Sequence, residues 1–201
     1  MSHYFSEKQD SKLKTCKITL SIKGISFTLF SGSGVFSKNA LDLGSRILIE
    51  NAIIKDNANV LDLGCGYGAV GISVKKLYPS SSVTMADVNE RALALAKKNI
   101  ELNCLESISA IKSNVFESLT DVKFDVILLN PPQSAGKDLC IKMILESKEH
   151  LNSNGTLQIV ARHNKGGESL SYIMEETFGN VKTIAKQGGF RIYLSENLKV
   201  L

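Results

Sequence analysis

Three glycines at alternate positions end the apolar stretch at residues 59–63: Gly64, Gly66 and Gly68. The residues that follow, 70–78, have the composition of a helix, so this segment predicts a strand, a tight turn and a helix N-terminus. Such a corner binds nucleosides and phosphates, because glycine lets a ligand approach the backbone and adopts positive φ angles at little cost. The turn predicts a nucleoside cofactor, but several cofactors fit it.

Two carboxylates beside this turn narrow the choice. Asp87 ends the next predicted strand, where it can accept hydrogen bonds from both ribose hydroxyls, although an aspartate there can also cap a helix. The pattern from Gly64 to Ala69 also fits the dinucleotide fingerprint, so a nicotinamide-dependent oxidoreductase is an open alternative. Asp62 argues against it, because a carboxylate just before the turn repels a pyrophosphate and can hold the ammonium end of a cofactor that carries an amino acid.

Short apolar runs alternate with helical patterns after residue 59, which predicts parallel strands joined by helical crossovers. The expected strands are 60–63, 82–86, 108–112, 124–129, 156–161, 181–186 and 191–194, and the expected helices are 69–78, 90–103, 137–151 and 168–178. The last two strands have no helix between them and are joined through the turn at residues 187–189, so they should form an antiparallel hairpin at one edge.

Ahead of this core, residues 17–29 alternate in polarity around Gly24 and predict another hairpin, and residues 41–54 predict an amphipathic helix. The fold class is therefore α/β. We expect a Rossmann-like seven-stranded, mostly parallel sheet with an antiparallel C-terminal edge hairpin, preceded by an N-terminal β-hairpin and helix.

The composition limits the class of protein. With 201 residues, 43% of them hydrophobic, we expect a single domain, with residues 1–58 as an N-terminal extension and residues 59–201 as the core that binds cofactor and performs catalysis. Four widely spaced cysteines predict reduced thiols and no metal site. With no secretory or membrane-spanning segment, the expected location is cytoplasmic, and the net charge of +4 modestly favours RNA as a partner.

The motifs taken together resemble a known family. The run from Asp62 to Gly68, with Asp87 and Asn130-Pro131-Pro132, is similar to the class I S-adenosylmethionine-dependent methyltransferases. Residues 34–37 and 41–45 narrow the resemblance to the methyltransferase small-domain family, which includes the ribosomal small-subunit RNA guanine-N2 methyltransferases and single-domain archaeal relatives. The similarity runs from about residue 27 to the C-terminus.

This resemblance implies S-adenosylmethionine as the cofactor. The glycine turn would pack against its methionine part, Asp87 would bind its ribose, and Asn114 and Val115 would contact its adenine ring. Phe36 and Asp42 match positions that close over the methionine end, although Phe36 could instead be a core residue. The implied cofactor site comprises Phe36, Asp42, Asp62, Gly64, Cys65, Gly66, Gly68, Asp87, Val88, Asn114, Val115 and Asn130.

The predicted catalytic residues are Asn130, Pro131 and Pro132, at the end of the fourth predicted strand. Methyl transfer needs a nitrogen lone pair, which an exocyclic amine or a carboxamide delocalises into its π system. The Asn130 side-chain oxygen and the Pro131 carbonyl can accept the two N–H groups and free that lone pair, while the prolines keep the backbone extended. A simple loop after a buried strand is the alternative. Because this loop has no cysteine, nitrogen is the expected acceptor.

The substrate is less well defined, because the family usually has an aromatic residue after the second proline and this chain has Gln133. Either another ring supplies the stacking, with Phe190, Phe36 and Tyr67 as the candidates, or the acceptor differs. Arg162 and Lys165 could meet phosphates or lie in a solvated loop. The predicted substrate site comprises Gln133, Arg162, Lys165 and Phe190. We expect an N-methyltransferase acting on guanine N2 in rRNA or tRNA. The alternatives are methylation of a protein glutamine amide, NAD-dependent oxidation, and cofactor binding without catalysis.

Overall fold

The computed structural model describes residues 7, 12–37 and 39–198. Within this part of the chain, seven strands form one sheet in the order β5-β4-β3-β6-β7-β9-β8. β9 runs antiparallel to both of its neighbours, and the other pairs are parallel, which confirms the predicted fold class. These strands are β3 (Asn59–Leu63), β4 (Ser82–Asp87), β5 (Ile108–Lys112), β6 (Phe124–Leu129), β7 (Leu151–Arg162), β8 (Lys182–Gln187) and β9 (Phe190–Glu196).

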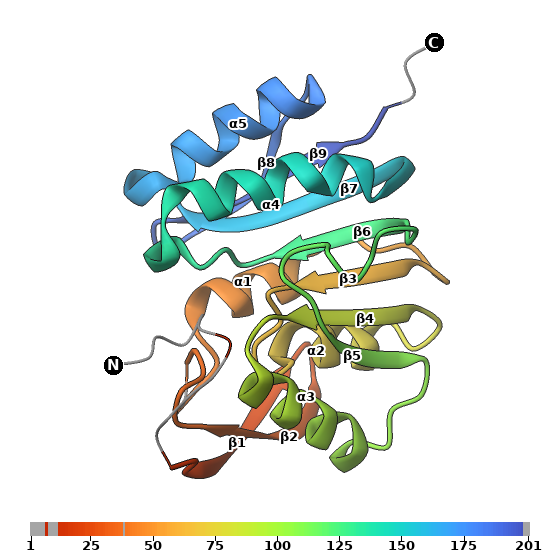
Figure 1. Cartoon of the computed structure of the whole chain (residues 1–201), viewed down its shortest axis with the longest axis vertical. Coiled ribbons are helices and arrows are strands. Elements are labelled where there is room, and N and C mark those ends of the chain that lie inside the picture. Colours follow the sequence, from red (N-terminus) through yellow and green to blue (C-terminus); the bar gives the residue numbers. More distant parts are fainter. Residues whose placement is uncertain (1–6, 8–11, 38, 199–201) are drawn as a thin grey trace.

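Helices cover both faces of this sheet (Figure 1). Three of them, α1 (Leu43–Asn51), α2 (Ala69–Leu77) and α3 (Glu90–Leu102), share a buried core with one face. The other two, α4 (Lys137–Glu149) and α5 (Glu168–Phe178), share a core with the opposite face. Since side chains of β3 and β6 are buried on both faces, these strands are nearly continuous apolar runs instead of alternating ones.

The predicted N-terminal hairpin is confirmed as β1 (Thr15–Ile22) and β2 (Ile25–Gly32), joined by a two-residue turn with positive φ at both positions. One buried asparagine of α3 attaches this hairpin to the core. Asn99 accepts a hydrogen bond from the Phe30 amide at 2.6 Å and donates to the carbonyls of Phe30 at 2.8 Å and Tyr67 at 2.9 Å. The hairpin is thereby tied to the glycine turn.

Two elements differ most from the ranges that the sequence predicts, α1 and β7. α1 is shorter than residues 41–54, because Asp42 caps its N-terminus and the helix ends at Asn51. β7 begins at Leu151 instead of residue 156, although residues 152–155 have the composition of a loop. Pairing between β6 and β7 shifts register between Phe124 and Val126, so an irregularity absorbs these residues into the strand.

The order of the strands predicts where a ligand binds to this sheet. β3 lies between β4 and β6, so the chain fills the sheet outward from β3 in one direction and then in the other. Ligands of such sheets bind beyond the carboxyl ends of the strands at this reversal. The ends of β3, β4, β5 and β6 are therefore the place to look for chemistry.

Candidate active site

A cavity of about 110 Å³ opens at the carboxyl ends of these four strands. A smaller cavity of about 50 Å³ adjoins it, several times the space that one water molecule needs, which is about 15 Å³. The larger cavity is lined by Val35, Phe36, Leu63, Gly64, Gly66, Ala86, Asp87, Val88, Ala92, Ser113, Asn114, Val115, Asn130, Pro131, Pro132, Leu139 and Met143. The smaller one is lined by Phe36, Ser37, Asp42, Ser45, Asp62, Gly64, Cys65, Gly66, Tyr67, Ala69, Val70 and Asn130.

The glycine turn forms the floor that both cavities share. Gly64, Gly66 and Gly68 all have positive φ, at 73°, 56° and 90°, a conformation that other residues adopt only with strain. Gly68 is the N-cap of α2, and Gly64 and Gly66 line both cavities. The alternate spacing of the glycines is thus required by the shape of the turn.

Asp87 joins the second strand end to this turn. Its Oδ2 accepts a hydrogen bond from the Gly66 amide, and its Oδ1 accepts one from the Asn89 amide, both at 2.8 Å. The N-cap of α3 is Asn89, so the capping alternative for Asp87 is wrong. Burial raises the pKa of the Asp87 carboxyl, and the backbone N–H donors partly oppose that rise. A carboxylate held at two points and lining the cavity is suited to a pair of ligand hydroxyls.

Asp62 is buried beside the smaller cavity, with only 3% of its surface exposed. Its Oδ2 accepts a hydrogen bond from the Gly71 amide of α2 at 2.8 Å. Burial raises the pKa of this carboxyl to about 7; the charge of Asp87 adds to the rise, and the Gly71 N–H opposes it. Burial raises the pKa of the Cys65 thiol, and the charges of Asp87 and Asp62 add to the rise, so Cys65 is not an activated nucleophile.

The loop before α1 reaches over the cavities from the hairpin. Asn89 donates to the Gly34 carbonyl at 3.1 Å, and Arg91 donates to the Ser33 carbonyl at 3.0 Å. These bonds hold the loop so that Phe36 lines both cavities. Because 44% of the surface of Phe36 is exposed, the alternative that it is a core residue is wrong. No local pattern predicts that Asn89 and Arg91, at the start of α3, hold this loop.

Asn114 and Val115 line the larger cavity after β5. The Asn114 side-chain nitrogen donates to Glu117 at 2.6 Å, so the side-chain oxygen of Asn114 points away from Glu117. Val115 has a φ of 55°, an outlier for a β-branched residue, and the Ser113 hydroxyl donates to its carbonyl at 2.8 Å. Strained backbone of this kind is concentrated at functional sites.

Asn130 follows β6 and lines both cavities. Its side-chain nitrogen donates to the Ser45 hydroxyl at 3.0 Å and to Asp42 Oδ1 at 3.3 Å. The same Asp42 oxygen caps α1 by accepting from the Ser45 amide at 3.0 Å. Pro131 and Pro132 also line the larger cavity, so the predicted acceptor motif and the predicted cofactor residues meet at one place.

Of the predicted substrate residues, the structure pairs two. The Arg162 guanidinium lies 4.9 Å from the centre of the Phe190 ring. Phe190 packs against Gly44 at the start of α1, where an added Cβ would lie 3.1 Å from its ring. The pair is thus next to the helix start that contacts Asn130. The backbone of Gln133 begins a 3₁₀ turn, and its side chain lies outside the described part of the structure.

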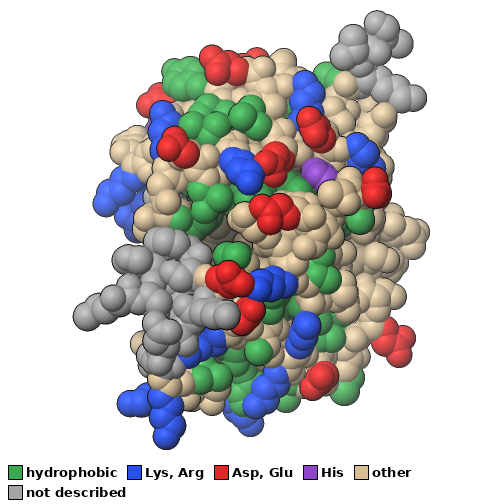
Figure 2. Space-filling model, viewed as in Figure 1, with side chains coloured by type: hydrophobic (Ala, Val, Ile, Leu, Met, Phe, Trp, Pro, Cys, Tyr) green, Lys and Arg blue, Asp and Glu red, His purple; other side chains and the backbone are tan. Residues whose placement is uncertain are grey.

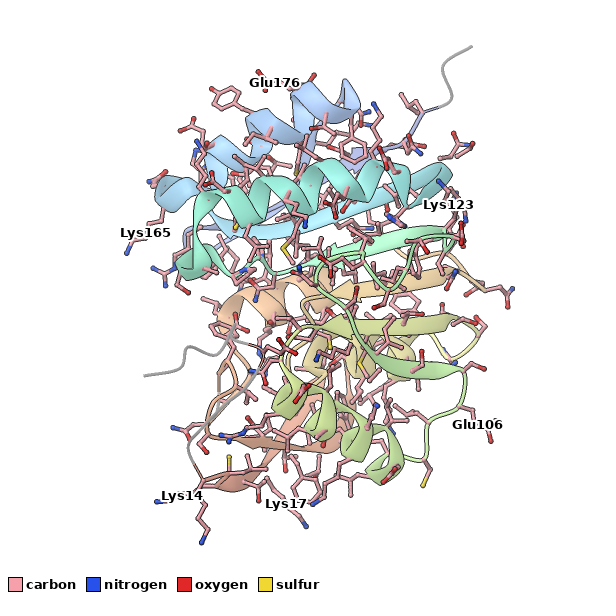
Figure 3. All side chains as sticks on the ribbon, viewed as in Figure 1. Lys14, Lys17, Glu106, Lys123, Lys165 and Glu176 are labelled. Atoms are coloured by element: carbon pink, nitrogen blue, oxygen red, sulfur yellow. The ribbon has the colours of Figure 1, made fainter. Side chains whose placement is uncertain are left out.

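Lys165 is separate from these residues. It lines a different hollow, between the starts of α4 and α5, together with Lys137, Cys140 and Ser169. On the face shown in Figure 2, acidic and basic side chains are mixed over the middle of the molecule, and basic ones predominate around the hairpin. Figure 3 labels Lys14 and Lys17 there, at the lower end of the view, and Lys165 at the left of the upper half. Lys165 therefore does not line the larger of the two cavities at the strand ends.

Within the described residues, no group of three or more His, Cys, Asp or Glu could hold a metal ion. None of the helices in that part of the chain is long and apolar enough to cross a membrane.

Comparison with known families matches residues 26–194 to the methyltransferase small domain. YbxB, an uncharacterised protein of Bacillus subtilis, is 36% identical over 192 residues, which cover 94% of this chain and 96% of YbxB. Ribosomal RNA small subunit methyltransferase C of Haemophilus influenzae is 35% identical over 176 residues, 85% of this chain but 51% of that protein. The chain therefore spans about half the length of the relatives that carry this name.

Solved structures of methyltransferases are also similar to this chain. The T. thermophilus 16S rRNA N2 G1207 methyltransferase, in complex with AdoMet and guanosine, superposes with a TM-score of 0.80 at 25% identity over 94% of this chain and 52% of that one. A methyltransferase from Pyrococcus furiosus has a TM-score of 0.68 at 24% identity, covering 77% of this chain and 82% of that one, and shows likeness of fold.

Proposed function

The chain belongs to the methyltransferase small-domain family, and on this premise we propose that it transfers a methyl group from S-adenosylmethionine to an exocyclic amine, guanine N2 in rRNA or tRNA. The similarity to ribosomal RNA methyltransferases supports this choice of substrate. Family membership favours methyl transfer over the nicotinamide-dependent alternative. The observation that carries the proposal is the Asn130 amide, whose nitrogen is occupied by Asp42 and Ser45 and whose oxygen is thereby directed away from them.

The residues of the two cavities fit the proposed cofactor. Asp87 would accept the ribose hydroxyls, Asn114 and Val115 would contact the adenine, and the glycine turn would leave room for the methionine part. The smaller cavity suits the amino-acid end. Asp62 offers a carboxylate there, and the buried Tyr67 hydroxyl, which has no hydrogen-bond partner among the described residues, offers a donor.

When bound, the cofactor supplies a sulfonium methyl group and a thioether leaving group. Asn130 Oδ1 and the Pro131 carbonyl would accept the two N–H groups of the substrate amine and so keep its lone pair out of the ring π system. Phe36 would exclude water from the methionine side, because it covers both cavities. The proton lost from the amine after transfer would pass to solvent, since the incoming methyl leaves the nitrogen strongly acidic.

The rim beside Asn130 is where we propose that the base docks. Phe190, flanked by Arg162, would provide the aromatic contact that Gln133 does not, and Arg162 would meet a phosphate. Lys165 and the lysines of the hairpin would bind more distant parts of the RNA. The hairpin shares a buried core with the sheet, which supports one methyltransferase unit with residues 1–58 as its extension.

The test is incubation with S-adenosylmethionine labelled in the methyl group, using unmodified total RNA and, separately, cell protein. We expect label in RNA, recovered as N2-methylguanosine by nucleoside mass spectrometry. Label only in protein, recovered on glutamine, would support the amide alternative and refute the RNA proposal. Asn130→Ala should bind S-adenosylhomocysteine as the wild type does and lose transfer; unchanged turnover would remove Asn130 from the mechanism.

A further inference from the structure

The amide of Asn130 is held by the N-cap residue of α1, Asp42, and by Ser45 in its first turn, which precede it in the sequence by 88 and 85 positions. An asparagine side chain has one donor end and one acceptor end of nearly the same shape. Only one of its two orientations presents the acceptor to a substrate amine. What decides between them is the chemistry of the groups that the amide faces.

Asp42 decides the orientation, because a carboxylate only accepts hydrogen bonds. Its Oδ1 lies 3.3 Å from the Asn130 nitrogen; a flipped amide would place an oxygen against that charge. Ser45 adds a second acceptor at 3.0 Å, and its own backbone amide holds the Asp42 oxygen in place. Ser45 is buried, with 6% of its surface exposed, so water has little access to its hydroxyl.

We infer that Asp42 and Ser45 are positioning residues, which fix the Asn130 amide with its oxygen toward the substrate before the substrate arrives. This inference rests on the proposed function for the role of Asn130. It differs from the role that family resemblance implies for Asp42, which is contact with the cofactor. Preorganised acceptors of this kind act on turnover more than on cofactor binding.

Asp42 also caps α1, so the test variant must keep the cap. Asp42→Ser does so, since serine caps helices about as well as aspartate, but its side chain is too short to hold Asn130. We expect its melting temperature to stay within about 3 °C of the wild type. Turnover of RNA should fall about 10- to 100-fold, with the Kd for S-adenosylhomocysteine within about twofold. Ser45→Ala should give a smaller loss of turnover with the same unchanged Kd.

Exchanging the carboxylate of Asp42 and the amide of Asn130 between the two positions should restore turnover that a single change removes. Asn130→Asp alone sets two carboxylates against each other and should be nearly inactive. Adding Asp42→Asn restores a donor opposite the new carboxylate, which can still accept from the substrate, so the double variant should regain at least about tenfold in turnover. Additive losses in the double variant would overturn the inference.

A readout without cofactor separates this inference from the proposed function. The side-chain amide signals of Asn130 can be identified in the ¹H–¹⁵N spectrum by their loss in Asn130→Ala. In Asp42→Ser they should shift toward the values of a solvated amide, as weaker hydrogen bonding predicts. Unshifted signals would overturn the inference, and so would wild-type turnover or a Kd raised more than about tenfold in Asp42→Ser. Absence of methyl transfer by the wild type would instead refute the proposed function.

Discussion

The buried carboxyl of Asp62 should make cofactor binding depend on pH. Burial raises its pKa to about 7, and it lines the smaller cavity, where we propose that the ammonium of the cofactor binds. Only the ionised form attracts an ammonium group. Acidification below neutral pH should therefore weaken binding by protonating Asp62.

The size of this effect follows from the titration. With a pKa of about 7, about 3% of the Asp62 carboxyls are ionised at pH 5.5 and about 75% at pH 7.5. If only the ionised form binds, the association constant should rise by about 25-fold across this range. Each binding event at the lower pH should also release close to one proton.

Isothermal titration calorimetry with S-adenosylhomocysteine measures both quantities, in buffers of different ionisation enthalpy. Asp62→Asn is the matched variant, because it keeps the shape of the side chain and does not titrate. 5′-Methylthioadenosine is the matched ligand, because it retains the ribose that Asp87 would bind and lacks the amino-acid end. We expect an affinity independent of pH in the variant, and little dependence for this ligand.

Two results would refute the reasoning. If Asp62→Asn shows the same rise in affinity with pH, another group titrates. If 5′-methylthioadenosine shows it with the wild-type protein, the dependence belongs to the ribose end and Asp87 is the candidate.

Four further outcomes are expected. In the folded protein the pKa of Asp62 is raised from its ordinary 3.8 to about 7. The free energy of unfolding of the ligand-free protein should therefore fall as pH rises between these two values, by up to about 4 kcal/mol. Urea titrations should show a smaller fall for Asp62→Asn. Asn99→Ala leaves three backbone groups without the Asn99 partner, the buried Tyr67 carbonyl and the part-buried N–H and C=O of Phe30, and should cost about 3 kcal/mol in the same assay. Gly71→Ala would place a Cβ 2.6 Å from Met85 Cγ and should cost about 1–3 kcal/mol, with part recovered by adding Met85→Ala; full stability of the single variant would contradict this close packing. Lys165→Ala should lower the slope of log K against log salt for RNA by about 0.7 to 0.9, and an unchanged slope would exclude a phosphate contact there.

Much of the fold was predictable because it depends on local patterns. Glycines at alternate positions after an apolar strand produced the expected turn, and alternation of strands and helices produced the expected sheet. β7 was predicted too short, because its first residues favour a loop locally and are held in the strand by remote partners, among them the backbone of Asn197, which bonds to Asn154 and Gly155. The start of α1 was also misplaced, since Asp42 caps the helix instead of lying within it.

The sequence was enough to predict which polar residues would lie together at the ends of the strands. Asp87, Asn114 and Asn130 do lie at neighbouring strand ends around one cavity, as the order of the motifs indicates. The sequence carried no sign of what supports them. Ser45 lies within a motif that suggested the family, but nothing local indicates that it contacts a residue 85 positions later.

The sequence by itself determined the class of fold, the glycine turn and the set of polar residues available at the strand ends, because each depends on neighbours within a few positions. Only the tertiary structure decided that Asn89 and not Asp87 caps α3, that burial raises the pKa of Asp62, and that Arg162 lies over Phe190. It also decided the orientation of the Asn130 amide. These properties depend on distances between remote residues and on the exclusion of water, and a linear pattern contains neither.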